Sequence, residues 1–322
     1  MPSTPDAHTH GSPPVPDPRL EGQYRIGRHR RLGFAEYGDP LGRTVFWFHG
    51  TPGGRRQMSP EGAIAAARMG LRIFVLERPG IGYSTKHLYD NVLGYADDVG
   101  RIADHLGIDE FGIVGLSGGG PYALACAYRF PDRVIGAAVL GGVAPTVGPD
   151  AVNGGAVGFA RRCAPLLEVV NRPLAFVLHR GVRVLVPFRD PLFGLYVAVS
   201  PEGDKRVFRR PEMKEMFIDD IMRSMRTQAA APVFDLVLFT RDWGFRLGDI
   251  RVPIRFWHGD ADHIVPLAHV QHLAGLVPDS ELRIRPGESH LGCLAAADEV
   301  FSVLLDLWPF PDLSVDTDVV GT

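Results

Sequence analysis

The sequence lacks the features of disulfide-rich, metal-cluster and membrane-spanning proteins. Among its 322 residues there are only three cysteines, Cys126, Cys163 and Cys293. Three scattered thiols are too few for a disulfide framework or a thiolate metal cluster. No run of about 18 apolar residues occurs, and a membrane-spanning helix would need one. We therefore expect small buried thiols in a protein of a reducing, cytoplasmic compartment.

An excess of charge of one sign is also missing. Thirty-four basic and 37 acidic residues leave a net charge of −3. Without a basic stripe the chain has no electrostatic footprint for nucleic acid, so we expect no nucleic-acid partner. Hydrophobic residues make up 45% of the chain and charged residues 22%, which is sufficient for a buried core.

The two ends of the chain lack apolar periodicity. The N-terminal residues are rich in proline and have no apolar stretch of the kind found in a secretory signal peptide. We predict a disordered tail over residues 1–19 and a flexible tail over residues 311–322.

Between these ends, short apolar runs alternate with helical stretches. Residues 24–37 are expected to form an antiparallel strand pair. The later strands are predicted at 44–48, 72–76, 111–116, 134–140, 253–257 and 281–284, and the helices at 61–69, 95–106, 121–130, 267–276 and 294–307. Such alternation predicts βαβ units, and therefore a mostly parallel sheet with helices on both faces.

The alternation stops between residues 143 and 239, where we predict a helical lid inserted between two parts of one core, residues 20–142 and 240–310. A helix over 211–227 carries Met213, Met216 and Phe217. These side chains would either contact an apolar substrate or attach the lid to the core. Residues 166–199 mix apolar side chains with arginines. We expect a buried lid helix there, and transient contact with a lipid surface is the alternative.

The most informative segment is FGIVGLSGG at 111–119, where an apolar strand ends in Gly115-Leu116-Ser117-Gly118-Gly119 and a helix follows. This G-x-S-x-G pattern predicts a sharp strand-to-helix turn that exposes the hydroxyl of Ser117. Glycines two residues before and after the serine avoid clashes in the turn. Ser117 is therefore the candidate nucleophile.

A serine hydroxyl needs a general base, and the base needs an orienting carboxylate. His290 follows a late strand, and the preceding strand is followed by Asp260 and Asp262 in HGDADHIVP. Loops after neighbouring parallel strands meet at the same edge of the sheet. We predict His290 as the base and Asp262 as the orienting acid, with Asp260 as its rival.

The segment HGTPGG at 49–54 follows an early strand and can point backbone N–H groups toward Ser117. The N–H groups of Thr51 and Gly118 are therefore predicted to form an oxyanion hole. His258, Asp260, Asp262 and His263 also resemble a metal site, but the same turn supplies the triad acid. No metal is expected.

In five motifs the chain resembles the α/β-hydrolase superfamily over about residues 20–310. The motifs are HGTPGG at 49–54, ERPGIGYS at 77–84, GLSGG at 115–119, HGDADHIVP at 258–266 and SH at 289–290. The resemblance implies the α/β-hydrolase fold with an inserted helical lid. In the family's HGxxD pattern the second acid is catalytic, which favours Asp262. Glu77 stands where the family usually has aspartate.

With serine at the strand-to-helix turn, the resemblance implies a carboxylesterase or lipase-like enzyme that needs no cofactor. The substrate would be a small, hydrophobic ester or related acyl compound. Carbon–carbon bond hydrolysis and cofactor-free perhydrolysis on the same fold are the enzymatic alternatives. A receptor-like protein that binds a ligand and retains vestigial activity is the alternative from another class. The sequence does not determine the oligomeric state.

Overall fold

In a computed structural model, residues 16–153 and 161–309 are described, and a single eight-stranded sheet runs through them. Its strands are β1 (Leu20–Arg25), β2 (Arg31–Gly38), β3 (Arg43–Phe48), β4 (Leu71–Leu76), β5 (Phe111–Leu116), β6 (Val134–Leu140), β7 (Ile254–Gly259) and β8 (Ser280–Arg285). The spatial order is β1-β2-β4-β3-β5-β6-β7-β8. The first two pairings, β1–β2 and β2–β4, are antiparallel and the others are parallel. The predicted mostly parallel sheet is thus confirmed.

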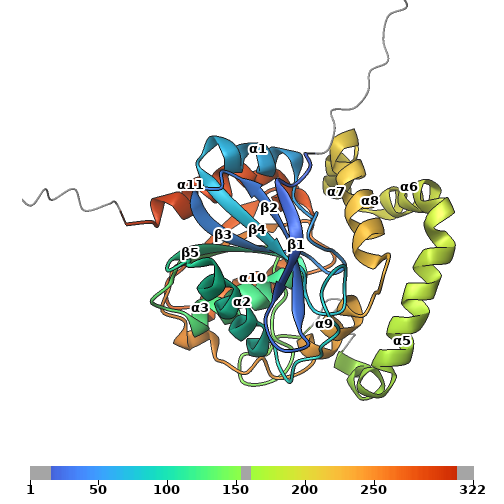
Figure 1. Ribbon diagram of the computed structural model, residues 1–322, viewed down its shortest axis with the longest axis horizontal. Helices are drawn as coiled ribbons and strands as arrows, with labels where there is room; N and C mark the ends of the chain where they lie inside the picture. The colour runs from blue at the N-terminus through green and yellow to red at the C-terminus, as the bar shows by residue number, and fades with distance from the viewer. Residues whose placement is uncertain (1–15, 154–160, 310–322) are drawn as a thin grey trace, which may run out of the picture.

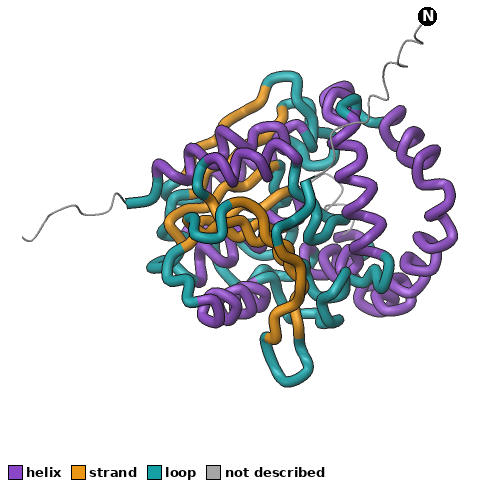
Figure 2. Tube along the Cα trace, turned by 45° about the horizontal axis from the view of Figure 1, so that its top comes forward, coloured by secondary structure: helices purple, strands orange, loops and turns teal. Residues whose placement is uncertain are grey.

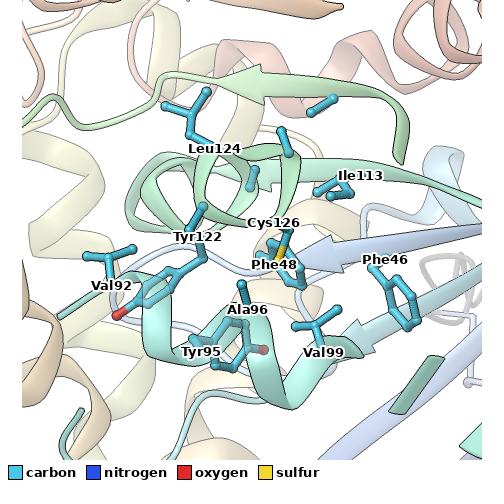
Figure 3. Close-up of a cluster of buried hydrophobic side chains, with 14 of the residues drawn as sticks. Phe46, Phe48, Val92, Tyr95, Ala96, Val99, Ile113, Tyr122, Leu124 and Cys126 are labelled. Atoms are coloured by element: carbon cyan, nitrogen blue, oxygen red, sulfur yellow. The ribbon is translucent and has the colours of Figure 1, made fainter. Parts of the chain in front are cut away.

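Helices cover both faces of this sheet (Figure 1). One face carries α1 (Pro60–Arg68) and α11 (Ala297–Asp306), and the other carries α2 (Leu93–Leu106), α3 (Gly120–Arg129) and α10 (Leu267–Leu276). Alternate residues of a strand point to opposite faces, so Val45 and Trp47 of β3 pack toward one layer, and Phe46 and Phe48 toward the other. Figure 3 shows Phe46, Phe48, Tyr95 and Tyr122 in the second layer.

The alternation of strands and helices is interrupted between β6 and β7, where the sequence indicated an insertion. This inserted region contains α5 (Ala164–Leu185), α6 (Arg189–Val199), α7 (Glu202–Phe208), α8 (Pro211–Met225) and α9 (Ala231–Phe239). Figures 1 and 2 show α5, α6 and α8 together on one side of the molecule, with α5 outermost. The insertion lies over the edge where the parallel strands end.

The two predicted tails fall almost entirely outside the described residues. Residues 16–19 of the first one are described, however, and two of them form ion pairs with the body of the protein. Asp17 pairs with Arg56 at 2.8 Å, and Arg19 pairs with Glu36 at 2.6 Å. No helix in the described part of the chain is long and apolar enough to cross a bilayer.

Candidate active site

Ser117 lies in the turn between β5 and α3, and its φ of 50° is the one positive value at a non-glycine residue in the described ranges. This region of φ is costly for a side chain that has a Cβ. The neighbours must be small, because a Cβ at Gly115 would lie 2.7 Å from the Gly119 carbonyl oxygen, and one at Gly119 would lie 2.2 Å from the Phe48 carbonyl oxygen. The turn holds the Ser117 side chain at the carboxyl end of the sheet.

A continuous chain of hydrogen bonds leads from this serine through two loops. The Ser117 Oγ lies 2.8 Å from Nε2 of His290, and Nδ1 of His290 lies 2.7 Å from Oδ2 of Asp262. His290 follows β8 and Asp262 follows β7, which is the neighbouring strand in the sheet. All three residues are buried. The structure therefore brings together the three residues that the motifs indicated.

The geometry also distinguishes the two candidate acids. Burial alone would raise the pKa of Asp262, but the hydrogen bond and charge of His290 outweigh it and hold that pKa below its ordinary value. Backbone N–H groups of Ile264 and Val265 donate to the other oxygen, at 2.8 and 2.9 Å. Asp260 is exposed and accepts a hydrogen bond from the Gly287 N–H at 2.7 Å. Asp262 is therefore the carboxylate that contacts His290.

Thr51 and Gly118 lie against each other beside the serine. A Cβ placed on Gly118 would be 2.2 Å from the Thr51 hydroxyl oxygen, so the two segments approach as closely as glycine allows. That hydroxyl donates to Oδ2 of Asp235 at 2.5 Å and accepts from Nη2 of Arg78 at 2.9 Å. These contacts fix the loop whose N–H groups were predicted to face the reacting carbonyl.

A buried ion pair holds the Thr51 loop in place. Arg78 and Asp235 approach to 2.8 Å, and both side chains are almost wholly buried. Arg78 also donates to the carbonyl oxygens of His49 at 2.6 Å and Gly50 at 2.7 Å. The Tyr122 hydroxyl donates to the second oxygen of Asp235 at 2.7 Å. The sequence placed ERPGIGYS among the family motifs but gave no role to Arg78, Asp235 or Tyr122.

Asp204 of α7 holds the histidine loop in a similar way. Its two oxygens accept hydrogen bonds from the Leu291 N–H at 2.8 Å and the Ser289 hydroxyl at 3.2 Å, so it bonds to the residues on both sides of His290. Burial raises the pKa of Asp204, although these hydrogen bonds act in the opposite direction. No sequence motif pointed to this residue.

Asp220 of α8 is a third buried carboxylate from the inserted region. It accepts hydrogen bonds from the N–H groups of Gly54 at 2.9 Å and Arg56 at 3.0 Å. Burial raises its pKa to about 7, because two N–H donors and the more distant Arg55 do not offset the loss of hydration. It anchors the far end of the HGTPGG loop to α8.

An apolar cavity of about 390 Å³ opens above Ser117 and His290. Phe193 and Tyr196 of α6 and Phe217 and Ile221 of α8 form its outer wall. Of the three predicted contacts in the lid, Phe217 therefore reaches the cavity.

Met213 and Met216 do not line this cavity, which corrects our expectation that they contact substrate. They are fully buried in the core cluster that includes Phe208 and Leu291. Helical spacing explains the difference, because Met213 and Met216 share the buried stripe of α8 with Asp220, whereas Phe217 lies on the adjacent face. The methionines attach the inserted region to the core, as the alternative had it.

The other histidines near the site have structural partners. Nδ1 of His49 lies 2.8 Å from the Gly50 carbonyl, and burial together with Arg78 holds the pKa of His49 well below its ordinary value. Nε2 of His258 lies 2.8 Å from the Val265 carbonyl, and burial lowers the pKa of His258 as well. Over residues 16–153 and 161–309, no three His, Cys, Asp or Glu side chains gather as a metal site would require.

Comparisons with known proteins agree with this architecture. A family model described as alpha/beta hydrolase fold matches residues 43–163. A non-heme haloperoxidase of Rhodococcus erythropolis is 28% identical over 274 residues, which cover 82% of this chain and 91% of that protein. A 2-hydroxy-6-oxo-6-phenylhexa-2,4-dienoate hydrolase of Burkholderia cepacia is 27% identical over 245 residues, which cover 74% of this chain and 77% of that protein.

Among solved structures, a thermophilic esterase from Thermogutta terrifontis superposes with a TM-score of 0.63 at 20% sequence identity. The match covers 89% of this chain and 99% of the esterase. At this identity the likeness concerns the fold alone. With its mixed eight-stranded sheet, its helical insertion after β6 and its serine at the turn after β5, the chain has the α/β-hydrolase fold.

Proposed function

We propose that this protein is a serine hydrolase that cleaves a carboxylic ester or a related acyl compound of a small, apolar substrate. One observation carries the proposal. The hydrogen bonds that join Ser117, His290 and Asp262 end at the floor of the apolar cavity, where the serine is held at a φ of 50°. A nucleophile, its base and the orienting acid are thus arranged in the order that acyl transfer needs.

In the first half of the reaction, the Ser117 Oγ attacks the carbonyl carbon of the bound ester. The proton of the hydroxyl moves to Nε2 of His290, and the carbonyl oxygen becomes an oxyanion. Asp262 keeps the proton of Nδ1 directed at itself, which selects the tautomer that leaves Nε2 free to accept. The imidazolium then gives its proton to the departing alcohol, and an acyl-serine remains.

The backbone N–H groups of Thr51 and Gly118 stabilise the oxyanion. Loss of one such donor typically costs about 3 kcal/mol in the transition state. In the second half, His290 takes a proton from water, whose oxygen attacks the acyl carbon, and the same proton returns to the Ser117 Oγ as the acid leaves. The balance requires only the ester and one water molecule.

The chemistry of the cavity supports an apolar acyl group. Its outer wall is formed by Phe193, Tyr196, Phe217 and Ile221, and its lining contains no Asp, Glu, Lys or Arg. A cavity of about 390 Å³ suits a small molecule. One similar fold is that of an esterase, and one relative is named as the hydrolase of a 6-oxo dienoate; both names imply attack at a carbonyl carbon, which supports an acyl substrate for this chain.

Labelling with a fluorophosphonate probe and turnover of nitrophenyl esters test the proposal. Wild type should be labelled and active, and Ser117→Ala should lose both. The chain also offers a matched pair of acids. Asp262→Asn should lower kcat by about 10³- to 10⁴-fold. Asp260→Asn should change it less than about threefold, because among the described residues its carboxylate bonds only to the Gly287 N–H. Turnover retained by Ser117→Ala contradicts the mechanism.

A panel of substrates separates the rival activities. Esters of graded chain length should be turned over, with apolar acyl groups preferred to charged ones. Cleavage of a vinylogous diketone without any ester turnover would instead favour carbon–carbon hydrolysis, and peroxide-dependent turnover would favour perhydrolysis. Labelling at Ser117 without steady-state turnover of any substrate would favour the receptor-like alternative.

A further inference from the structure

The most unusual surface of the protein is the outer side of α5 and α6. On α5, the stripe formed by Leu167, Asn171 and Ala175 is buried against the protein. The opposite stripe is also apolar, with Val169 78%, Phe176 64% and Val184 71% exposed. A helix that carries apolar side chains on both its inner and its outer side is normally covered on both. Here one side is open, as the outermost position of α5 in Figures 1 and 2 shows.

This apolar surface continues onto α6. Leu195 is 63% exposed and Val199 is 76% exposed, and α6 contains no buried residue. Most of the large exposed apolar side chains in the described part of the chain lie between Leu166 and Val199. We call this surface the outer face, formed by the exposed side chains Leu166, Val169, Phe176, Val177, Val184, Leu185, Val186, Phe188, Leu192, Leu195 and Val199.

The outer face is bordered by arginines that lack acidic partners. Arg172, Arg180 and Arg183 are exposed on α5 and form no ion pair with any described residue. The two acids of the same segment are already occupied, Glu168 by Arg241 at 2.6 Å and Asp190 by Lys214 at 3.2 Å. The outer face therefore has a local excess of positive charge, although the protein as a whole is slightly acidic, with a net charge of −3.

A cleft of about 600 Å³ between α5 and α8 adjoins the outer face. Its apolar floor includes Val182, Val186 and Met222, and it is also lined by Arg183, Arg189 and Arg226, with no acidic residue. Guanidinium groups around an apolar floor suit a phosphate that is attached to an acyl chain, because each part meets a complementary surface.

We propose that the outer face and this cleft dock the protein onto an anionic phospholipid surface. Exposed apolar side chains would enter the acyl boundary, and the arginines would lie among the headgroups, as in helices that lie in the plane of a membrane interface. No described helix is suited to cross the bilayer, so the contact is peripheral. A symmetric dimer through the same face fits less well, because it would bring the unpaired arginines of both copies together.

The position of α6 gives this contact a consequence for access to the site. Leu192 and Leu195 belong to the outer face, whereas Phe193 and Tyr196 of the same helix line the cavity above Ser117. Docking would therefore place the wall of the cavity beside the lipid phase. The docking itself does not depend on the proposed hydrolysis and can be measured with the Ser117→Ala protein.

Flotation with vesicles tests the proposal. Wild type should float with vesicles of phosphatidylcholine that contain phosphatidylglycerol, and much less with phosphatidylcholine alone. Binding should fall as salt is raised from low to high concentration. Arg180→Glu with Arg183→Glu should weaken the binding about tenfold or more. The matched control is Arg28→Glu with Arg251→Glu, which reverses two exposed arginines outside the inserted region and should change binding less than about twofold.

Several outcomes would overturn the inference. Equal binding to neutral and anionic vesicles, or binding that salt does not affect, would remove the role of the arginines. A wild-type dimer in light scattering that Arg180→Glu with Arg183→Glu dissociates, together with no flotation, would identify a second copy as the occupant. Should the double variant fail to fold, the lipid and salt dependence of wild type still decides the question.

Discussion

The two halves of the inserted region differ in how they meet the rest of the protein. The inner half, α7 to α9, contributes three buried carboxylates, Asp204, Asp220 and Asp235. Each of them bonds to a loop at the carboxyl edge of the sheet. The outer half, α5 and α6, buries only Leu167, Asn171 and Ala175 and exposes a continuous apolar surface. The inner half thus holds the loops of the candidate site in place, whereas the outer half mainly presents an exposed apolar surface.

This difference has an energetic meaning. A buried carboxylate costs free energy to desolvate, and it persists because its partners are held in place around it. Removing it leaves buried donors unsatisfied, which is expensive. An exposed apolar side chain loses little when it is shortened, because it buries little area on folding. Substitution of a buried carboxylate in the inner half should therefore lower stability or activity strongly, whereas substitution of an exposed apolar side chain in the outer half should change them little.

Asp235→Ala should give the largest effect. It leaves the buried Arg78 without its counterion and the hydroxyls of Thr51 and Tyr122 without an acceptor. The free energy of unfolding should fall by about 3–5 kcal/mol, and ester turnover should be lost because the Thr51 loop is released. Urea unfolding measures the first quantity and a nitrophenyl ester the second.

Glu215→Ala is the control for Asp235→Ala, since Glu215 is an exposed carboxylate in the same inserted region. It should change stability by no more than about 0.5 kcal/mol. If both variants had the same stability, the inner half would not support the site in the way its contacts indicate.

Asp204 should affect catalysis more than stability. Asp204→Ala removes both bonds to the loop around His290, and a displaced base should lower kcat by about 10- to 100-fold with KM unchanged. Asp204→Asn keeps an acceptor for the Leu291 N–H and should recover most of the rate. A purely structural role would instead lower the stability of both variants without changing the kcat of the folded fraction.

Asp220 should make stability depend on pH. Its pKa is raised to about 7 in the folded protein from an ordinary value near 4, so the folded state holds its proton where the unfolded state has lost it. This contribution is therefore fully present at low pH and declines between about pH 4 and 7, by up to about 1.4 kcal/mol per unit. Urea unfolding between pH 5 and 8 should show this slope in wild type.

Asp220→Asn provides the comparison, because its amide does not titrate. The difference in unfolding free energy between wild type and this variant should shrink as pH rises to 7 and stay constant above it. A difference that does not vary with pH would mean that Asp220 remains ionised in the folded protein throughout.

The sequence predicted the sheet side of the site well, because the signals there are local. A strand followed by G-x-S-x-G specifies the Ser117 turn, and loops after neighbouring parallel strands must meet, which placed Asp262 near His290. The choice between Asp260 and Asp262 needed the family pattern, since both lie in one turn.

The contribution of the inserted region could not be predicted. Asp204, Asp220 and Asp235 act through partners that lie more than eighty residues away in the chain, and no local spacing marks such contacts. The positions of Met213 and Met216 were likewise not determined by local spacing. Their spacing defines one face of a helix, but only packing decides whether that face meets the core or the cavity.

The outer half should give the smallest effect. Phe176→Ser together with Val184→Ser shortens two side chains that are 64% and 71% exposed. Each change should cost no more than about 0.5 kcal/mol in unfolding free energy, and turnover of a short, soluble ester should be unchanged. Leu167→Ala is the control on the same helix, since its buried side chain packs against Val237 and should cost about 2 kcal/mol or more. A large loss of stability in the double variant that grows with protein concentration would show that a second copy covers the outer face, because stability then depends on association.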